Sequence, residues 1–370
     1  MSIELPFSLV DNRVFLRVRV NGQGPLEFVL DTGAGDGSSV SMTTFRRLGL
    51  PNEGSDYVTG AGAAKAQVVK SHANSLRVGT TELGPVPLMA IPLQDMINAI
   101  GFEKFDGILG DALFNRFVVT IDFNRNRINL DDPEAYRPPA GAIIVPITSY
   151  NHLVPMYDGA VDGIPGKFLI DLGDRSSLTL FRPFWSAHGL NKTGVLAMTG
   201  IGIGGPIRGV VTRVGALTLG TVQVTQPVTR LVLQKPSAID DHVIAGSVGT
   251  GILKRFQVTF DYRHGRMILM PGASAGRPDL YDRAGIWLGR AGHELKVLDV
   301  TPGGPAEAAG IKPGDVVVSV DGTAAADVNL PALRDRLTML SVGSVALGVD
   351  EAGHRSVRRL VLRDLIPPAH

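Results

Sequence analysis

Apolar and polar residues alternate along much of this chain in runs of four to eight residues, separated by Gly, Pro, Asn and Asp. Typical runs are VFLRVRV, FVVTIDF, RINL and QVTF. A period of two over so short a length predicts strands, and the intervening residues predict turns. Helices should be few, and the best candidates are residues 42–48 and 182–188, with a further turn at 111–116. The pattern therefore predicts a mainly β protein.

The same pattern occurs twice along the chain. The segment EFVLDTGA, which contains Asp31, aligns with KFLIDLGD, which contains Asp171. Further matches follow along the repeat, such as Gly49 with Gly189, Gly79 with Gly220 and Asp122 with Asp261. We therefore predict two lobes of common origin, at residues 1–135 and 140–270. The Pro- and Gly-containing segments DDPEAYRPPAGA and PGASAGRPDL read as linkers, which leaves residues 281–370 as a third unit.

Composition agrees with many short strands and narrows the function. The chain has 45 Gly and 24 Pro with only 19% charged residues, and its 370 residues are enough for two or three separate cores. Its 36 basic and 35 acidic residues nearly cancel, so no long-range field should attract nucleic acid or an anionic membrane. The absence of cysteine excludes thiol nucleophiles, disulfides and cysteine-ligated metals.

The first residues, MSIELPFSLVDNRVF, alternate like a strand and show no signal peptide. No membrane span is predicted either. These features leave the compartment open.

The repeated Asp31 and Asp171 are the candidate reactive groups. Each ends a run of three apolar residues and begins a turn, which Gly33 and Gly173 would allow to be tight. If the lobes pair about a pseudo-twofold axis, the two carboxylates meet, share one proton and have split pKa values. The ionised group can then take a proton from water while the protonated group polarises a scissile carbonyl, which suits amide hydrolysis. The alternative is structural, with Asp31 only capping the turn that follows it.

The segment Asp31-Thr32-Gly33-Ala34, followed later in the same lobe by Ile108-Leu109-Gly110, resembles the aspartic peptidases, and the short lobes resemble their retropepsin-like bacterial branch. The resemblance covers both predicted lobes. It implies two acid-protease-like β-barrels with Asp31 and Asp171 as the catalytic pair. It also implies that Thr32 links the two active-site loops, and that these loops are supported by Gly33, Ala34, Gly173, Ile108, Leu109 and Gly110. The second lobe departs from the family at two positions, where Leu172 replaces Thr or Ser and Asp174 replaces Ala or Ser.

Two Gly-rich segments, 59–62 and 199–205, begin at the same distance after Asp31 and Asp171. Gly60, Gly62, Gly200 and Gly202 are candidates for the tips of flaps that close over an extended substrate, as in the resembled family; ordinary surface hairpins are the alternative. The histidines have no metal-ligand spacing, and we predict no metal and no cofactor. Asp106 and His242 could approach the cleft, although a structural role is favoured for both.

From Gly285 onward the chain resembles a bacterial PDZ domain. The segments that carry the resemblance are Gly304-Pro305-Ala306, Ala309-Gly310-Ile311, Lys312-Pro313-Gly314-Asp315 and Asp321-Gly322. We expect short helices at 305–309 and 333–340, the second lining a groove. The resemblance implies a peptide bound as an added strand, with its terminal carboxylate held by the loop Gly285, Ile286, Trp287 and Leu288. The alternative is a domain that only packs against the peptidase.

Together these features predict an aspartic endopeptidase that acts on a polypeptide substrate, with a PDZ-like unit that recruits a substrate or the C-terminal tail of a partner. One chain supplies both aspartates, so a dimer is not required. Two alternatives remain: a decayed peptidase that acts as a peptide-binding or adaptor protein, and an enzyme that pairs lobe one with lobe one of another chain. The combination of peptidase and PDZ resembles bacterial envelope or regulatory proteases and favours the periplasm.

Overall fold

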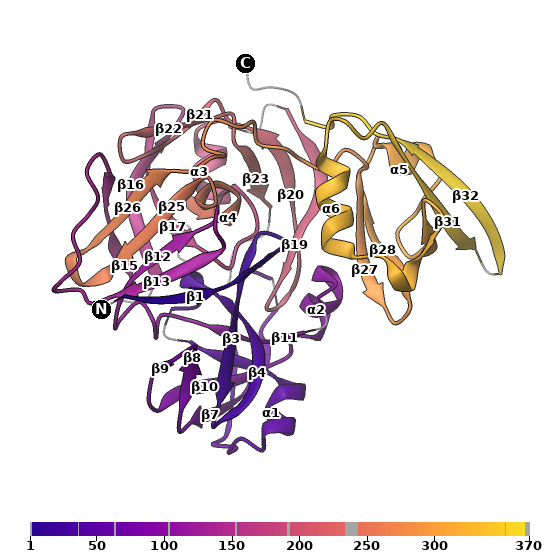
Figure 1. Ribbon diagram of the computed structural model, residues 1–370. Coiled ribbons are helices and arrows are strands. Elements are labelled where there is room, and N and C mark those ends of the chain that lie inside the picture. The colour runs from indigo at the N-terminus through magenta and orange to yellow at the C-terminus, as the bar shows by residue number, and fades with distance from the viewer. Residues whose placement is uncertain are drawn as a thin grey trace.

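The computed structural model describes residues 2–366 except 36, 63, 103, 152–153, 191–192, 234–242 and 352. It is mainly β, with two large sheets of similar strand order, a six-stranded sheet between them and a smaller sheet at the C-terminus (Figure 1). This confirms the predicted fold class. In the part of the chain that is described, no helix is long and apolar enough to cross a membrane.

The N-terminal lobe is a ten-stranded mixed sheet in the order β6-β7-β10-β5-β11-β4-β3-β8-β9, with β2 paired to β3. Its strands are β2 (Ser8–Val10), β3 (Arg13–Val20), β4 (Gln23–Leu30), β5 (Ser39–Ser41), β6 (Ser55–Val58), β7 (Ala66–Ala73), β8 (Leu76–Val78), β9 (Thr81–Glu82), β10 (Val86–Ile91) and β11 (Phe105–Leu109). Two helices accompany them, α1 (Met42–Leu48) and α2 (Gln94–Ile100).

The C-terminal lobe repeats this topology in the order β19-β20-β23-β18-β24-β17-β16-β21-β22, with β15 paired to β16. Its strands are β15 (Thr148–Tyr150), β16 (Val154–Val161), β17 (Ile164–Asp171), β18 (Leu178–Leu180), β19 (Val195–Gly202), β20 (Gly205–Arg213), β21 (Ala216–Leu219), β22 (Val222–Thr225), β23 (Val228–Val232) and β24 (Gly246–Gly249). Its helices are α3 (Arg182–Ala187) and α4 (Thr250–Leu253). Adding 13 to the label of each strand of the first lobe gives its counterpart in the second.

A six-stranded sheet in the order β1-β13-β12-β25-β26-β14 joins the lobes. Its strands are β1 (Ile3–Pro6), β12 (Val118–Asp122), β13 (Arg127–Asp131), β14 (Ile143–Pro146), β25 (Phe256–Asp261) and β26 (Arg266–Pro271). The two central strands are equivalent in the repeat and run antiparallel, with Thr120 opposite Thr259 and their hydroxyl oxygens 2.8 Å apart. Since these two threonines correspond in the repeat, the pseudo-twofold axis passes between them. One buried hydrophobic cluster extends through this sheet into both lobes.

The third unit has its own sheet, in the order β27-β28-β29-β31-β32 with β30 paired to β29, and its own buried hydrophobic cluster. Its elements are β27 (Ile286–Ala291), β28 (Glu294–Val300), α5 (Pro305–Ala308), β29 (Val316–Val320), β30 (Thr323–Ala324), α6 (Leu330–Thr338), β31 (Ser344–Glu351) and β32 (His354–Val361). Helix α6 lies on the side of this unit that faces the lobes (Figure 1).

The predicted helix at 42–48 coincides with α1, which begins after Ser41, whose hydroxyl accepts the Thr44 N–H at 3.0 Å. The helix predicted at 182–188 ends one residue earlier. The prediction of 333–340 was wrong at both ends, because α6 spans Leu330–Thr338. Asn329 caps that helix by accepting the Ala332 N–H, and Pro331 is tolerated in the first turn. Helix α2 was not predicted.

Candidate active site

Strands β4 and β17 bring Asp31 and Asp171 to the boundary between the lobes. Each strand has a parallel neighbour, β11 beside β4 and β24 beside β17. The Asp31 N–H donates to the Leu109 carbonyl at 2.9 Å, and Asp171 lies opposite Gly249 in the register. Both aspartates therefore lie at the end of a strand that is fixed from the side by a buried neighbour.

The two carboxyl groups are close enough that each shifts the pKa of the other. A Cβ atom on Gly33 would lie 2.6 Å from the Asp171 Cγ, and a Cβ on Gly173 would overlap the Asp31 carboxyl group. Neither glycine has a positive φ. The turns therefore do not require the conformational freedom of glycine. Each glycine is needed because the carboxyl group of the opposite lobe lies against it.

Thr32 links the two active-site loops. Its buried hydroxyl donates to the Ile170 carbonyl at 2.8 Å and accepts the Leu172 N–H at 3.0 Å. Leu172 has no hydroxyl to return this contact, and its own carbonyl accepts the Thr250 hydroxyl at 3.0 Å. Thr32 thus bonds to the loop of the C-terminal lobe, but Leu172 offers no equivalent bond to the loop of the N-terminal lobe. Thr250 holds the Leu172 backbone instead.

Burial raises the pKa of both carboxyl groups, and that of Asp171 lies well above its ordinary value. At Asp31 the N–H groups of its own loop and the hydrogen bond from Asp171 oppose the rise. At Asp171 the negative charges of Asp31 and Asp174 add to it. The arrangement therefore favours one shared proton on Asp171, with Asp31 as the ionised member.

Asp174 is a third carboxylate at this site, and it is buried in the same loop as Asp171. It forms an ion pair with Arg230 and accepts hydrogen bonds from the Thr179 hydroxyl at 3.1 Å and from the Ser176 N–H at 2.9 Å. Burial opposes its ionisation, but Arg230 and these donors outweigh burial and lower the pKa of Asp174. Asp174 is therefore ionised and does not point outward. Its counterpart in the other loop is Ala34, so the electrostatic symmetry of the pair is broken on one side.

The turn between β2 and β3 holds residues 171–177 of the C-terminal lobe, which we call the catalytic loop after the predicted role of Asp171. The Arg13 Nε donates to the Gly173 carbonyl at 3.2 Å, and the Asn12 side-chain amide donates to the Arg175 carbonyl at 2.8 Å. Asp11 positions Arg13 through an ion pair of 2.6 Å. Sequence analysis missed these residues; the only signal was a charged residue, Arg13, at the start of an apolar run.

The segment Ile108-Leu109-Gly110 supports the loop of the N-terminal lobe. Leu109 is fully buried, and a side chain on Gly110 would overlap the Gly35 carbonyl oxygen. That carbonyl accepts the Asp111 N–H at 2.8 Å. The segment therefore packs directly against the turn that follows Asp31.

The two Gly-rich segments form hairpin tips that touch each other. The Gly62 N–H donates to the Ile203 carbonyl at 2.9 Å, and the Ala64 N–H donates to the Gly204 carbonyl at 3.0 Å. Each tip comes from a different lobe, so these two bonds tie the lobes together.

Three of the four glycines proposed for these tips are needed for close approach. A Cβ on Gly60 would lie 2.6 Å from the Ile203 Cβ, a Cβ on Gly202 would lie 2.9 Å from the Ala61 Cβ, and one on Gly62 would overlap the other tip. Gly200 has ordinary space around it, with the nearest atom 3.5 Å from such a Cβ.

Beneath the tips lies a cleft of about 440 Å³ that contains both aspartates. Its walls are apolar on both sides of the pair, with contributions from Met89, Ile91 and Met96 of the first lobe and Leu169, Phe181 and Val232 of the second. The cleft can therefore accept an extended chain whose apolar side chains lie to either side of the carboxyl groups.

Asp106, a further candidate from the sequence, has a structural role. Asp106 accepts the Glu27 N–H at 3.0 Å and the Thr44 hydroxyl at 2.9 Å, and it pairs with Arg47. It therefore fixes strands and does not face the cleft. His242 lies outside the described residues. Within those residues, no group of three or more acidic or histidine side chains is arranged to hold a metal ion.

The loop at the start of β27 has its N–H groups occupied. The Asp282 carboxylate accepts the N–H groups of Ala284 at 3.1 Å, Gly285 at 2.6 Å and Ile286 at 3.2 Å. Burial raises the pKa of Asp282 to about 6, against these bonds. Two of the four donors that we expected to hold a terminal carboxylate, those of Gly285 and Ile286, are thus already bonded to a carboxylate of the chain itself.

Comparison with known proteins agrees with both parts of the sequence analysis. Residues 16–111 match the family model described as aspartyl protease, and residues 296–334 match the model described as PDZ domain. A C-terminal processing peptidase, chloroplastic, from Tetradesmus obliquus is 49% identical over 49 residues, which are 13% of this chain and 11% of that protein. The chain thus spans about a tenth of the length of this relative. The chain carries an aspartyl protease domain followed by a C-terminal PDZ domain.

Proposed function

We propose that this protein is an aspartic endopeptidase that hydrolyses peptide bonds with water activated between Asp31 and Asp171. The observation that carries the proposal is the close approach of the two half-buried carboxyl groups, each lying against the glycine of the opposite lobe. Buried carboxyl groups that share a proton are costly to maintain for folding alone, because burial penalises the charged form.

Each carboxyl group has a defined task. Asp31, as the ionised member, takes a proton from a water molecule that attacks the scissile carbonyl carbon. Asp171, as the protonated member, donates a hydrogen bond and then its proton to the carbonyl oxygen. When the tetrahedral intermediate collapses, Asp31 gives its proton to the leaving nitrogen, the C–N bond breaks, and a hydroxyl of the intermediate returns a proton to Asp171 as the carboxyl product forms. The pair thus regains its starting state, and no covalent intermediate with the enzyme is needed.

The substrate is a polypeptide in extended form. The apolar walls of the cleft and the two tips above it favour a segment with hydrophobic side chains near the cleaved bond. The PDZ domain is proposed to recruit a peptide segment of the substrate or of a partner.

The first test is cleavage of an unfolded protein and of a peptide library between pH 3 and 8. We would compare the natural protein with Asp31→Asn and Asp171→Asn, and use Asp106→Asn as the matched control, since Asp106 is a carboxylate outside the cleft. Activity should be lost in both dyad variants, kept in the control and blocked by an inhibitor that mimics the tetrahedral intermediate.

Two other results would redirect the proposal. No cleavage by the natural protein at any pH would favour a decayed peptidase that acts as a peptide-binding protein. Activity that survives Asp171→Asn but depends on protein concentration would favour an enzyme assembled from the first lobes of two chains.

A further inference from the structure

The groove side of the PDZ domain is occupied by the first lobe. Helix α2 packs against β27, the end strand of the PDZ sheet, where an added peptide strand would pair. The end of α2 also contacts α6, since a Cβ on Gly101 would lie 2.8 Å from the Leu330 side chain. The space between β27 and α6 is therefore shared with a segment of the chain itself.

Arg334 of α6 is the polar centre of this contact. Its guanidinium donates to the Ile100 carbonyl at 2.9 Å, to the Ala99 carbonyl, and to the Leu288 carbonyl of β27 at 2.8 Å. One side chain thus fastens the C-terminal end of α2 to the end strand of the PDZ sheet. The carbonyl groups at the end of a helix favour such a cation.

The same guanidinium reaches the turn that holds the catalytic loop. Arg334 lies 3.5 Å from the Asp11 carboxylate, which also pairs with Arg175 at 2.9 Å and with Arg13 at 2.6 Å. The Asp11 side chain is 2% exposed. Burial opposes its ionisation, but the three arginines outweigh burial and lower the pKa of Asp11 to about 2. The buried Asp11 carboxylate therefore connects Arg334 of the PDZ domain with Arg175 of the catalytic loop. It also holds Arg13, which bonds to the same loop.

Trp287 of the PDZ domain adds to the contact between Arg334 and the catalytic loop. Its ring contacts the guanidinium groups of both Arg175 and Arg334, with its centre 5.3 Å and 5.5 Å from the two Cζ atoms. Such cation–π contacts are attractive, the more so when the groups are shielded from water. Trp287 belongs to the loop predicted to bind a peptide, yet here it covers a residue of the catalytic loop.

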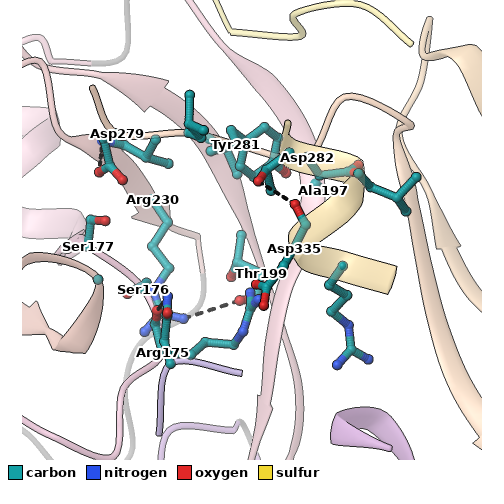
Figure 2. Close-up of a pocket in the computed structure, with 18 of the residues that line it drawn as sticks. Arg175, Ser176, Ser177, Ala197, Thr199, Arg230, Asp279, Tyr281, Asp282 and Asp335 are labelled. Carbon is teal, nitrogen blue, oxygen red and sulfur yellow. Dashed lines mark hydrogen bonds between the residues drawn. The ribbon is translucent and has the colours of Figure 1, made fainter. Parts of the chain in front are cut away.

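Two arginines line both the cleft and a second cavity, which lies beside the PDZ domain. A cavity of about 360 Å³ is lined by Arg175 and Arg230 from the C-terminal lobe and by Asp335 from α6 (Figure 2). Arg175 and Arg230 also line the cleft with the two aspartates. No described residue of the PDZ domain lines that cleft, so the domain contacts the catalytic loop from behind and leaves the substrate path open.

We infer that Arg334 is a positioning residue of the catalytic centre: through Asp11 and Arg13 it fixes the Gly173 carbonyl, and so the loop that carries Asp171. The inference rests on the proposed function, since it deepens the role of the same site. It assigns the PDZ domain a part in holding the dyad, in addition to any peptide that it binds. A side chain of the third domain thereby supports a loop of the second through a turn of the first.

The test compares Arg334→Met with Arg336→Met in the full chain. Arg336 lies on the same helix but is 39% exposed and pairs with Asp321 inside the PDZ domain, so it is a matched control. Amide hydrogen exchange of residues 171–177, followed by mass spectrometry, reports the loop without any substrate. We expect exchange in this loop to become at least about tenfold faster in Arg334→Met and to stay unchanged in the control.

Kinetics provide the second measurement. A loop that carries a catalytic group but is held less firmly should lower kcat roughly tenfold while KM changes by less than about threefold. Arg334→Lys keeps a charge near Asp11 but cannot reach Asp11 and the carbonyls together. Its kcat should therefore lie between those of the natural protein and Arg334→Met. In a Trp185→Phe background Trp287 is the only tryptophan, and its quenching by acrylamide shows whether its contact with Arg334 has opened.

Loop exchange and kcat that both remain at the natural level in Arg334→Met, while Trp287 becomes accessible to acrylamide, would overturn the inference. If the natural protein cleaves nothing, the proposed function has failed, and loop exchange alone then decides whether Arg334 positions the loop. Arg334→Met protein that fails to fold is replaced by Arg334→Lys, to which the same criteria apply.

Discussion

Asp174 should determine which aspartate of the pair holds the proton, and this can be tested by removing its charge. The Asp174 N–H lies 3.0 Å from the Asp171 carboxylate, and its own carboxylate is ionised beside Arg230. The negative charge of Asp174 raises the pKa of Asp171, while the neutral Ala34 has no such effect on Asp31. Asp174→Asn should therefore lower the pKa of Asp171.

The size of the shift follows from Coulomb's law. A unit charge about 6 Å away in a medium of effective dielectric constant near 20 changes the energy of an ionised group by about 3 kcal/mol. That energy corresponds to about 2 pKa units, and greater screening would halve it. Activity requires the shared proton, so it is lost as pH rises through the pKa of Asp171. The upper limb of kcat/KM against pH should thus move down by about 1–2 units in Asp174→Asn.

The double variant Asp174→Asn/Arg230→Gln is the control for the unpaired arginine. Removal of one partner of a buried ion pair costs about 3–5 kcal/mol of unfolding free energy, and removal of both costs less. The double variant should therefore be more stable than Asp174→Asn, with its upper limb nearer to the natural position. An upper limb that stays within about 0.3 pH units of the natural protein in Asp174→Asn would refute the reasoning.

Three further predictions concern the same site. Gly33→Ala should reduce kcat/KM by more than about a hundredfold because the new methyl group meets the Asp171 carboxyl group, whereas Gly276→Ala, which has open space, should not; steady-state kinetics of both variants decide this. Asp171→Asn should raise the free energy of unfolding near pH 7 by about 1–3 kcal/mol, since burial already disfavours the charged carboxyl; urea unfolding with an unchanged or lower midpoint would contradict it. Asp11, with a pKa of about 2 against an ordinary 3.8, should contribute about 2 kcal/mol of stability that is present above about pH 4 and lost as pH falls toward 2; this acid sensitivity should be weaker in Asp11→Asn.

The fold class could be predicted because strand periodicity and the internal repeat are local, redundant signals. Ten strands of one lobe have counterparts in the other, so errors in single strands did not alter the result. Helix α2 was not predicted because it is one short helix between a Pro-containing segment and Gly101, and the sequence repeat shows no copy of it. The start of α6 was misplaced because Pro331 reads as a helix breaker, although its position in the first turn makes it compatible with a helix.

The candidate site was accessible to sequence analysis only where the repeat marks it. Asp31 and Asp171 are found because each occupies the same place in its copy. The ion pair of Asp174 with Arg230 joins residues 56 positions apart, and the contact of Arg334 with Ile100 spans 234 positions. Nothing in the periodicity of a single chain specifies such pairs, because they depend on how lobes and domains pack.

The contact between the two hairpin tips bears on how long a ligand remains bound. Two backbone hydrogen bonds, from Gly62 and Ala64 to the opposite tip, cross above the cleft. A molecule that leaves past the tips must first break these bonds, so on this route its dwell time depends on the rate at which the tips separate as well as on its own contacts. Compounds that add a hydrogen bond to the tips should therefore dissociate more slowly without making any new contact with the floor of the cleft.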